Sequence, residues 1–188
     1  MINDFQKYFA SGFEYLNNNQ LEKAIKEFRK AEEINNESPT LYYNLGLAYY
    51  FNEDYDNAVN SLEMALELDD TMPEVYNELG NAYYALDDYV KAVENYKKAI
   101  EADSEYFEAY LNLGNSYFYK ADYGLSIENY SKVLELNPDD AEAHFYLGLT
   151  YLEIRKYETG REYLLKAKEL DPQFEDDVNI IIEELDEY

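Results

Sequence analysis

Five glycines recur at a constant spacing along this chain, and that spacing restricts the fold more than any other feature of the sequence. A tyrosine stands three residues after each glycine, at positions 15, 49, 83, 117 and 151. A fixed period of about 20 to 50 residues indicates a repeat architecture, in which similar supersecondary elements stack on one another. The glycines, at intervals of 34 residues without insertion, are Gly12, Gly46, Gly80, Gly114 and Gly148.

Each repeat carries the pattern of two helices. In the second repeat, Tyr42, Leu45, Gly46 and Tyr49 are spaced at i, i+3, i+4 and i+7, which is one stripe of a helix. The second half of the repeat places a small residue, Ala58, four residues before a large one. Because glycine inside a helix costs about 1 kcal/mol relative to alanine, we predict a close approach of the two helices at the glycine. The small residue of the second helix is expected to face the gap.

Prolines and short polar turns mark the ends of the predicted helices. Proline cannot continue a helix, and all four prolines lie where one repeat ends and the next begins. The turn inside each repeat contains no glycine, and we expect its aspartates to cap the helix that follows. The prolines are Pro39, Pro73, Pro138 and Pro172, and the expected caps are Asp54, Asp88 and Asp122.

This pattern resembles the tetratricopeptide repeat (TPR) family, whose repeat runs aromatic, two residues, Leu-Gly, two residues, Tyr, then Ala, three residues, Phe, and finally Pro. The resemblance covers residues 5–174. It implies an all-α fold, a right-handed α-solenoid of five helix-turn-helix repeats. The family commonly has glycine in the turn, and this chain lacks it. We predict one domain, 1–188, with repeats at 5–38, 39–72, 73–106, 107–140 and 141–174 and a C-terminal capping helix at 175–188.

The predicted capping helix has one apolar stripe. Val178, Ile181, Ile182 and Leu185 are spaced at i, i+3, i+4 and i+7. Ile182 occupies the position at which a repeat would place its glycine, so we expect no partner helix to pack closely behind it. No comparable cap precedes Phe5. The N-terminal repeat is therefore expected to be the more open end, where weak self-association could occur.

The charge balance restricts the partners. The chain has 15 Lys and Arg against 41 Asp and Glu, a formal net charge of −26. Nucleic acid and anionic membranes are disfavoured, because both require a clustered cationic surface. No run of about 18 apolar residues exists to span a membrane, and the first residues have neither a basic nor an apolar signal segment. We expect a soluble, cytoplasmic protein without membrane insertion.

The residues needed for common enzyme chemistry are scarce. The chain has no Cys, which excludes disulfides and thiolate sites. The one histidine, His144, stands at a position that an aromatic usually fills, and we interpret it as packed or hydrogen-bonded. No glycine-rich phosphate loop is present, and adjacent acids such as Asp69 and Asp70 do not have the spacing of a calcium loop. We therefore predict a protein that is not an enzyme and has no cofactor or metal.

The side of the first helices opposite the glycine stripe is the candidate binding surface, since the resemblance implies that it lines a concave groove. Two questions remain open at this point. Tyr50, Tyr84 and Phe118 share one position and either line the groove or pack neighbouring first helices together. The asparagines either grip a peptide backbone as a ladder or only solvate the wall. The predicted groove residues are Tyr43, Asn44, Leu47, Tyr50, Asn77, Asn81, Tyr84, Leu111, Asn112, Asn115, Phe118, Tyr119, Phe145, Tyr146 and Leu149.

The predicted groove contains no Lys or Arg. Chaperone-binding relatives hold an acidic C-terminal tail with basic groove residues, whereas here Glu74 and Glu78 stand where bases are needed. Glu74, Glu108 and Glu142 follow one edge. We predict a protein–protein interaction scaffold that binds a neutral or basic peptide or helix with apolar anchors and lacks the clamp for acidic chaperone tails. The alternative is a structural element that self-assembles through its end repeats.

Overall fold

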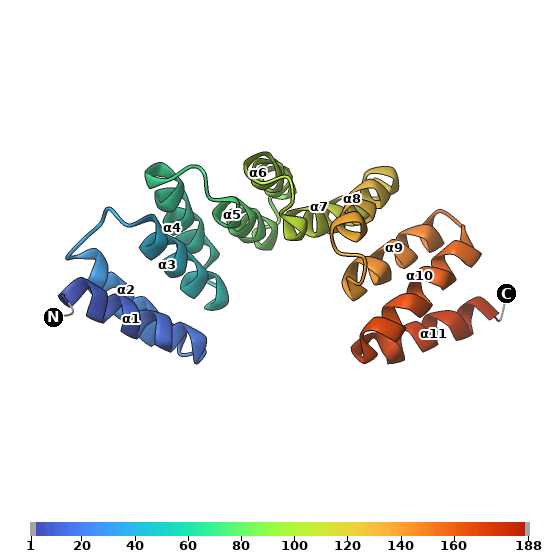
Figure 1. Cartoon of the computed structure of the whole chain (residues 1–188), viewed down its shortest axis with the longest axis horizontal. Helices are drawn as coiled ribbons and strands as arrows, with labels where there is room; N and C mark the ends of the chain where they lie inside the picture. The colour runs from blue at the N-terminus through green and yellow to red at the C-terminus, as the bar shows by residue number, and fades with distance from the viewer. Residues whose placement is uncertain (1–2, 187–188) are drawn as a thin grey trace. The chain divides into compact units, whose positions relative to one another are not determined.

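The computed structural model describes residues 3–186, and helices are the only regular elements in that range (Figure 1). Ten helices form five successive pairs, and a short 3-10 helix and one further helix follow them. The all-α, helix-turn-helix architecture predicted from the sequence is confirmed. The pairs are α1 (Asp4–Asn17) with α2 (Leu21–Glu32), α3 (Pro39–Phe51) with α4 (Tyr55–Leu68), α5 (Pro73–Ala85) with α6 (Tyr89–Ala102), α7 (Phe107–Tyr119) with α8 (Tyr123–Leu136), and α9 (Ala141–Glu153) with α10 (Tyr157–Leu170).

The chain divides into two compact units, which are described separately. Unit 1 extends to Asp103 and holds α1 to α6, and unit 2 begins at Ser104 and holds α7 to α11. In unit 1 every helix packs against the next, and α3 also touches α1 and α5. In unit 2, α7 touches α9, and α10 packs against η1 (Pro172–Phe174) and α11 (Glu175–Asp186). Residues 1–2 of the predicted domain and 187–188 of the predicted capping helix lie outside the described residues.

The repeat glycines lie where two helices approach closely, as predicted. A methyl group added at Gly80 would lie 2.5 Å from a ring carbon of Tyr96, and one at Gly12 would lie 2.6 Å from the ring of Phe28. The residue facing the glycine is thus the large residue of the second helix, and not the small one four positions earlier. The small residue still matters at Gly148, where the added methyl would lie 3.0 Å from the backbone oxygen of Gly160.

The five turns inside the repeats share one geometry that sequence alone left open. Three residues separate the two helices of each repeat, and the second of them adopts a left-handed conformation, with φ between 54° and 61°. In the first turn Gln20 N donates to Tyr15 O at 2.9 Å and Asn19 N donates to Leu16 O at 3.0 Å, which is the Schellman motif that ends a helix. The same pair of bonds recurs in the other four turns. The residues held at positive φ are Asn19, Glu53, Asp87, Ala121 and Arg155.

Helix caps follow the sequence with one exception. Asp54 accepts a hydrogen bond from Asn57 N at 3.4 Å, and Asp88 accepts one from Lys91 N at 3.2 Å. The predicted cap at Asp122 is wrong, because that side chain makes no such bond and nothing in the structure explains the difference. Prolines begin α3, α5 and η1.

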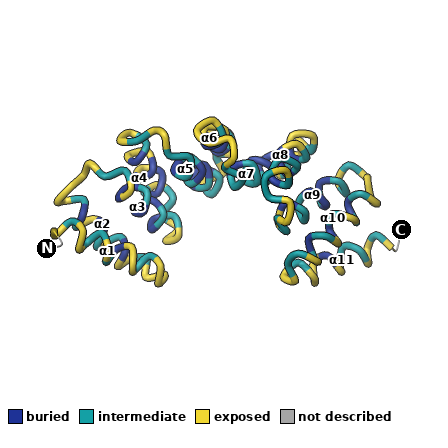
Figure 2. Tube along the Cα trace, viewed as in Figure 1, coloured by how far each residue is buried: buried dark blue, intermediate teal, exposed yellow. Residues whose placement is uncertain are grey.

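The C-terminal helix α11 buries only part of its apolar stripe. Figure 2 shows buried stretches inside the helices and exposed ones at the turns. Val178 of α11 is fully buried, while Ile181, Ile182 and Leu185 are only half-buried and Ile180 is exposed. The apolar stripe of the capping helix is therefore only partly covered.

No helix in residues 3–186 has the length and apolar character to cross a membrane.

Candidate functional site

In unit 1 the first helices place a carboxylate among tyrosines and amides. Glu78 on α5 accepts hydrogen bonds from Asn77 Nδ2 at 3.3 Å and Asn81 Nδ2 at 3.1 Å. The hydroxyl of Tyr96 on α6 donates to Asn81 Oδ1 at 2.8 Å. Tyr43 and Tyr50 on α3 interact electrostatically with Glu78. We call Tyr43, Tyr50, Glu78, Asn81 and Tyr96 the Glu78 cluster.

Burial dominates the electrostatics of the Glu78 cluster. It raises the pKa of the Glu78 carboxyl above the usual range, even though the bonds from Asn81 and Asn77 act in the opposite direction. Burial, followed by the charges of Glu78 and Glu74, raises the pKa of Tyr43 to about 12. Burial also raises the pKa of Tyr50 and of Tyr96. The cluster is thus partly desolvated and carries negative charge.

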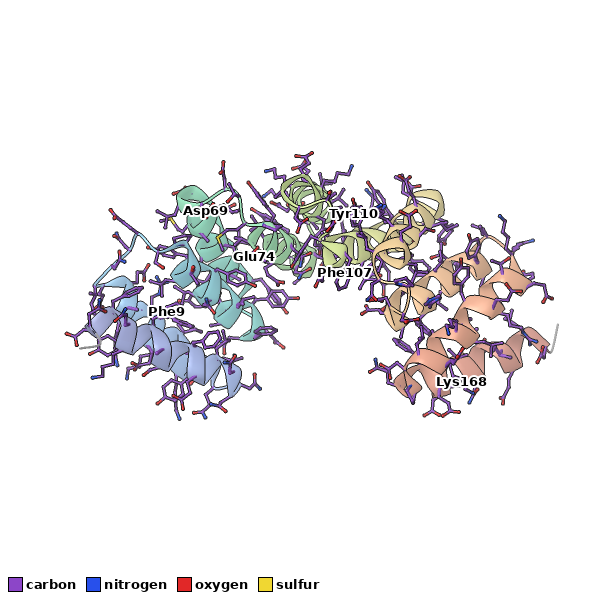
Figure 3. The ribbon with its side chains drawn as sticks, in the orientation of Figure 1. Phe9, Asp69, Glu74, Phe107, Tyr110 and Lys168 are labelled. Carbon is purple, nitrogen blue, oxygen red and sulfur yellow. The ribbon has the colours of Figure 1, made fainter. Side chains whose placement is uncertain are left out.

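No base within residues 3–186 forms an ion pair with the Glu78 carboxylate. Neither Glu78 nor Glu74, which lies at the start of α5 (Figure 3), takes part in an ion pair among the described residues. Several bases lie instead over tyrosines of the opposite stripe. Lys91 Nζ is 4.6 Å from the Tyr83 ring centre, and Arg29 donates to the Tyr49 hydroxyl at 3.0 Å.

The corresponding face of unit 2 is more aromatic. The Tyr130 hydroxyl on α8 donates to Asn115 Oδ1 on α7 at 2.6 Å. The ring of Tyr146 on α9 stacks on Tyr130 with centres 6.0 Å apart and contacts Phe118 at 6.5 Å. Burial raises the pKa of Tyr146, and the nearby Tyr119 and Glu142 raise it further. On this face too, an acid lies close enough to a phenol to interact with it electrostatically.

Two predicted groove residues need correction. Asn44 and Asn77 are only 6% and 3% exposed, so their amides are not offered to a ligand. Asn44 Nδ2 donates to the Thr40 oxygen of its own helix at 2.7 Å. The amide oxygens of Asn81 and Asn115 accept from Tyr96 and Tyr130, so the predicted ladder serves mainly to join the two helices of a repeat.

The position shared by Tyr50, Tyr84 and Phe118 has a packing role within each repeat that was not predicted from the sequence. Each ring packs on a tyrosine ring at the start of the second helix of the same repeat, with ring centres 5.1 to 6.0 Å apart. These partners are Tyr55, Tyr89 and Tyr123. Phe118 also contacts Tyr146 of the next first helix, as one of the two interpretations expected. All three side chains remain half-buried.

The remaining predicted residues fall on the faces of their own units. Leu47 lies half-buried on α3 in unit 1. Unit 2 contributes half-buried Leu111, Asn112 and Leu149 and the largely exposed Tyr119, at 64%. Phe145 is covered on one side by Phe174, whose ring centre is 4.8 Å away.

Glu78 is not among the groove residues predicted from the sequence. Its position in the repeat holds Asn44, Asn112 and Tyr146 in three other repeats, so a single acid there breaks the pattern. That irregularity was the available signal. The partners Tyr96 and Tyr130 carry no such signal, because both belong to the buried stripe of their helices.

The other chemical candidates are structural. His144 Nε2 donates to the Pro138 oxygen at 3.0 Å and its ring lies 5.6 Å from that of Tyr163, which confirms a packed histidine. No group of three or more acids and histidines within residues 3–186 is placed to hold a metal ion. A pocket of about 470 Å³ lies in unit 1 beside Tyr76 and Tyr83 and is lined by both bases and acids.

Known structures resemble this arrangement along most of the chain. The crystal structure of MamA protein matches with a TM-score of 0.79 and 25% identity, over 92% of this chain and 94% of MamA. YrrB, described as a TPR protein with an unusual peptide-binding site, matches with a TM-score of 0.70 and 25% identity, over 88% and 85% of the two chains. PilF of Pseudomonas aeruginosa, at 22% identity and a TM-score of 0.81 over 89% and 77%, shares the fold. Curated protein sequences give no significant match.

Family comparisons agree with the repeat pattern. The TPR repeat family matches residues 12–52, 80–120 and 114–154. Two further tetratricopeptide repeat families match 39–72 and 141–174, the same residues as the predicted second and fifth repeats. Together these matches include both helices of most pairs. The chain is a member of the tetratricopeptide repeat family.

Proposed function

We propose that this chain is a protein–protein interaction scaffold that binds a neutral or basic peptide or helix of a partner protein on the faces formed by its first helices. The observation that carries the proposal is the Glu78 cluster. A half-buried carboxylate lies there among phenols, and no base in the described part of the chain forms an ion pair with it. Binding, and not catalysis, is the proposed role.

The chemistry of the cluster favours a cationic group from the partner. A carboxylate that is already partly desolvated loses less hydration when an ammonium or guanidinium group approaches, and charge complementarity selects the partner. Tyrosine rings add cation–π attraction of about 0.5–1 kcal/mol at exposed sites. Tyr43 and Leu47 supply half-buried apolar surface on α3 for the anchors of the same segment.

The same charges disfavour an acidic tail. Two bases of unit 1, Lys91 and Lys98, lie over Tyr83 and Tyr76 of the opposite stripe. An acidic peptide on the first-helix face would meet Glu74 and Glu78 without a compensating base, and like charges brought together oppose binding. The peptide-binding site attributed to YrrB supports a peptide as the ligand type.

A displayed library of random 15-residue peptides, selected on the full chain, tests the proposal. We expect the enriched peptides to be rich in Lys or Arg beside aromatic or aliphatic residues. Tyr43→Ala should weaken binding of an enriched peptide about tenfold, because it removes an aromatic anchor. The matched change Tyr157→Ala, at an exposed residue of α10, should leave the affinity unchanged. Enrichment of acidic peptides, or equal effects of the two changes, would count against the proposal.

A further inference from the structure

A pocket in unit 2 lies where the last repeat meets the capping helix. It has a volume of about 330 Å³ and is lined by Glu142 and Tyr146 of α9, Gln173 and Phe174 of η1, and Asp177 of α11. We call these five residues the η1 pocket. Only Tyr146 among them belongs to the groove residues predicted from the sequence, so this is a separate binding element of the same unit.

The walls of the η1 pocket are held in place by η1 itself. The Asp171 carboxylate accepts hydrogen bonds from Gln173 N at 2.9 Å and Gln173 Nε2 at 2.7 Å. Phe174 N donates to the Asp171 oxygen at 3.2 Å. The Phe174 ring then stacks on Phe145 with centres 4.8 Å apart and planes 24° apart. The aromatic and amide walls are therefore ordered before any ligand enters, which lowers the entropy that binding must overcome.

The lining combines negative charge with aromatic rings. Neither Glu142 nor Asp177 forms an ion pair among the described residues. Lys168 of α10 (Figure 3) is engaged elsewhere, with Glu175 at 3.2 Å and Asn179 at 2.7 Å. Two unpaired carboxylates beside Tyr146 and Phe174 suit an organic cation, because the carboxylates supply charge and the ring faces attract a cation as well.

We infer that the η1 pocket binds the side chain of a lysine or arginine of the partner protein. The inference rests on the proposed function, since it names the chemical group by which unit 2 recognises the partner segment. A bare metal ion fits poorly, because two of the five lining residues are aromatic and only two offer a carboxylate. A long aliphatic side chain with a cationic end can place its stem on the rings and its charge at the carboxylates.

Amide NMR of the full ¹⁵N-labelled chain tests the pocket directly. The probes are Nα-acetyl-lysine-N-methylamide and its uncharged counterpart, Nα-acetyl-norleucine-N-methylamide. We expect the lysine probe to shift the side-chain amide of Gln173 and the backbone amides of Glu142, Phe174 and Asp177. The norleucine probe should leave them in place. Equal shifts with both probes, or lysine-induced shifts scattered over the whole acidic surface, would overturn the inference.

Neutral variants separate the pocket from the general acidity of the chain. Asp177→Asn and Glu142→Gln should each weaken binding of the lysine probe about threefold to fivefold. This is the effect of losing one surface ion pair of up to about 1 kcal/mol. Asp176→Asn removes the same charge from the neighbouring exposed residue, which does not line the pocket, and should change binding by less than about 1.5-fold. Equal losses in Asp176→Asn and Asp177→Asn would mean that the probe senses net charge only.

The inference about the η1 pocket and the proposed function can be rejected independently of each other. A library-selected peptide that needs Tyr43 but binds Asp177→Asn and Glu142→Gln as tightly as the original chain would retain the proposed function and reject the pocket. A lysine probe that binds as expected, on a chain that selects no peptide, would retain the pocket and reject the proposed function.

Discussion

Every turn between the two helices of a repeat holds a residue with a side chain at positive φ. A left-handed conformation costs an L-residue about 1–2 kcal/mol, and asparagine tolerates it better than most. Ala121 has neither the tolerance of asparagine nor the freedom of glycine, with φ at 58°. The absence of glycine from these turns is therefore a source of strain that the Schellman hydrogen bonds hold in place.

We expect Ala121→Gly to stabilise the chain. Relief of the left-handed strain exceeds the added entropy of the unfolded chain, about 0.4–1 kcal/mol, and leaves a net gain of about 0.5–1 kcal/mol. The urea midpoint followed by circular dichroism measures it. Asn19→Gly is the control and should gain less. A midpoint lowered by Ala121→Gly would show that the turn is not strained.

The repeat glycines give a second prediction at the residue scale. Gly80→Ala should destabilise the chain by about 1–3 kcal/mol, because the new methyl would meet the buried Tyr96 ring at 2.5 Å. Gly124→Ala meets no atom within 4 Å and should be neutral or stabilise by up to about 1 kcal/mol through helix propensity. Thermal midpoints compare the pair. If both changes shifted the midpoint in the same direction, close helix contact at Gly80 would not be the cause of the glycine.

Glu78 links the candidate site to pH. Burial raises its pKa in the folded chain, so the folded state holds this proton more tightly than the unfolded state. Its contribution to stability therefore decreases as pH rises from the ordinary glutamate pKa, about 4.3, through the raised value. We expect Glu78→Gln to raise the unfolding midpoint at pH 7 and to leave it nearly unchanged at pH 3.5. A lower midpoint at pH 7 would show that the charge stabilises the fold.

At the scale of helices, α1 differs from the first helices of the later repeats at three positions. Leu41, Leu45 and Ala48 of α3 are fully buried, and their equivalents in α5, α7 and α9 are buried too. In α1 the same positions hold Lys7, Ser11 and Glu14. Terminal repeats of solenoids need a polar outer face for solubility, and α1 supplies one.

This polar face bears on the alternative of self-assembly through the N-terminal repeat. We expect the chain to sediment as a monomer over a wide concentration range. Ser11→Leu combined with Glu14→Ala should induce association, because it restores the residues with which internal repeats pack. Sedimentation velocity distinguishes the two forms. Association of the unchanged chain through α1, abolished by further charges there, would favour the self-assembly alternative.

The helices were predictable because their pattern repeats five times, and each repeat tests the others. The turn geometry was not predictable from residue preference, because it depends on how two packed helices must be joined. Ala121 and Arg155 show this, since both are held at positive φ. The candidate site was predicted in part. Tyr43 and Asn81 are half-buried and keep part of their surface free, whereas Asn44 and Asn77 are buried. The sequence period indicates on which side of a helix a residue lies. How deeply that residue is buried depends on how closely the next helix packs.

At the scale of the whole chain, the net charge of −26 opposes the compact state through self-repulsion. The ion pairs among the described residues are largely exposed at their side chains, and such pairs contribute little. We expect the thermal midpoint to rise by a few degrees between about 10 mM and 500 mM NaCl, as the screening length falls from about 30 Å to a few Å. A midpoint that falls with salt would mean that ion pairs outweigh the repulsion.

The most direct test concerns whether Glu78 serves a partner and not the fold. Calorimetry with a basic peptide from the library selection gives the dissociation constants of the unchanged chain and of Glu78→Gln at pH 7. We predict binding about tenfold weaker in Glu78→Gln, equivalent to about 1.4 kcal/mol, without a lower unfolding midpoint. Unchanged affinity, or affinity and stability lost together, would contradict the proposal that this carboxylate is kept for a partner.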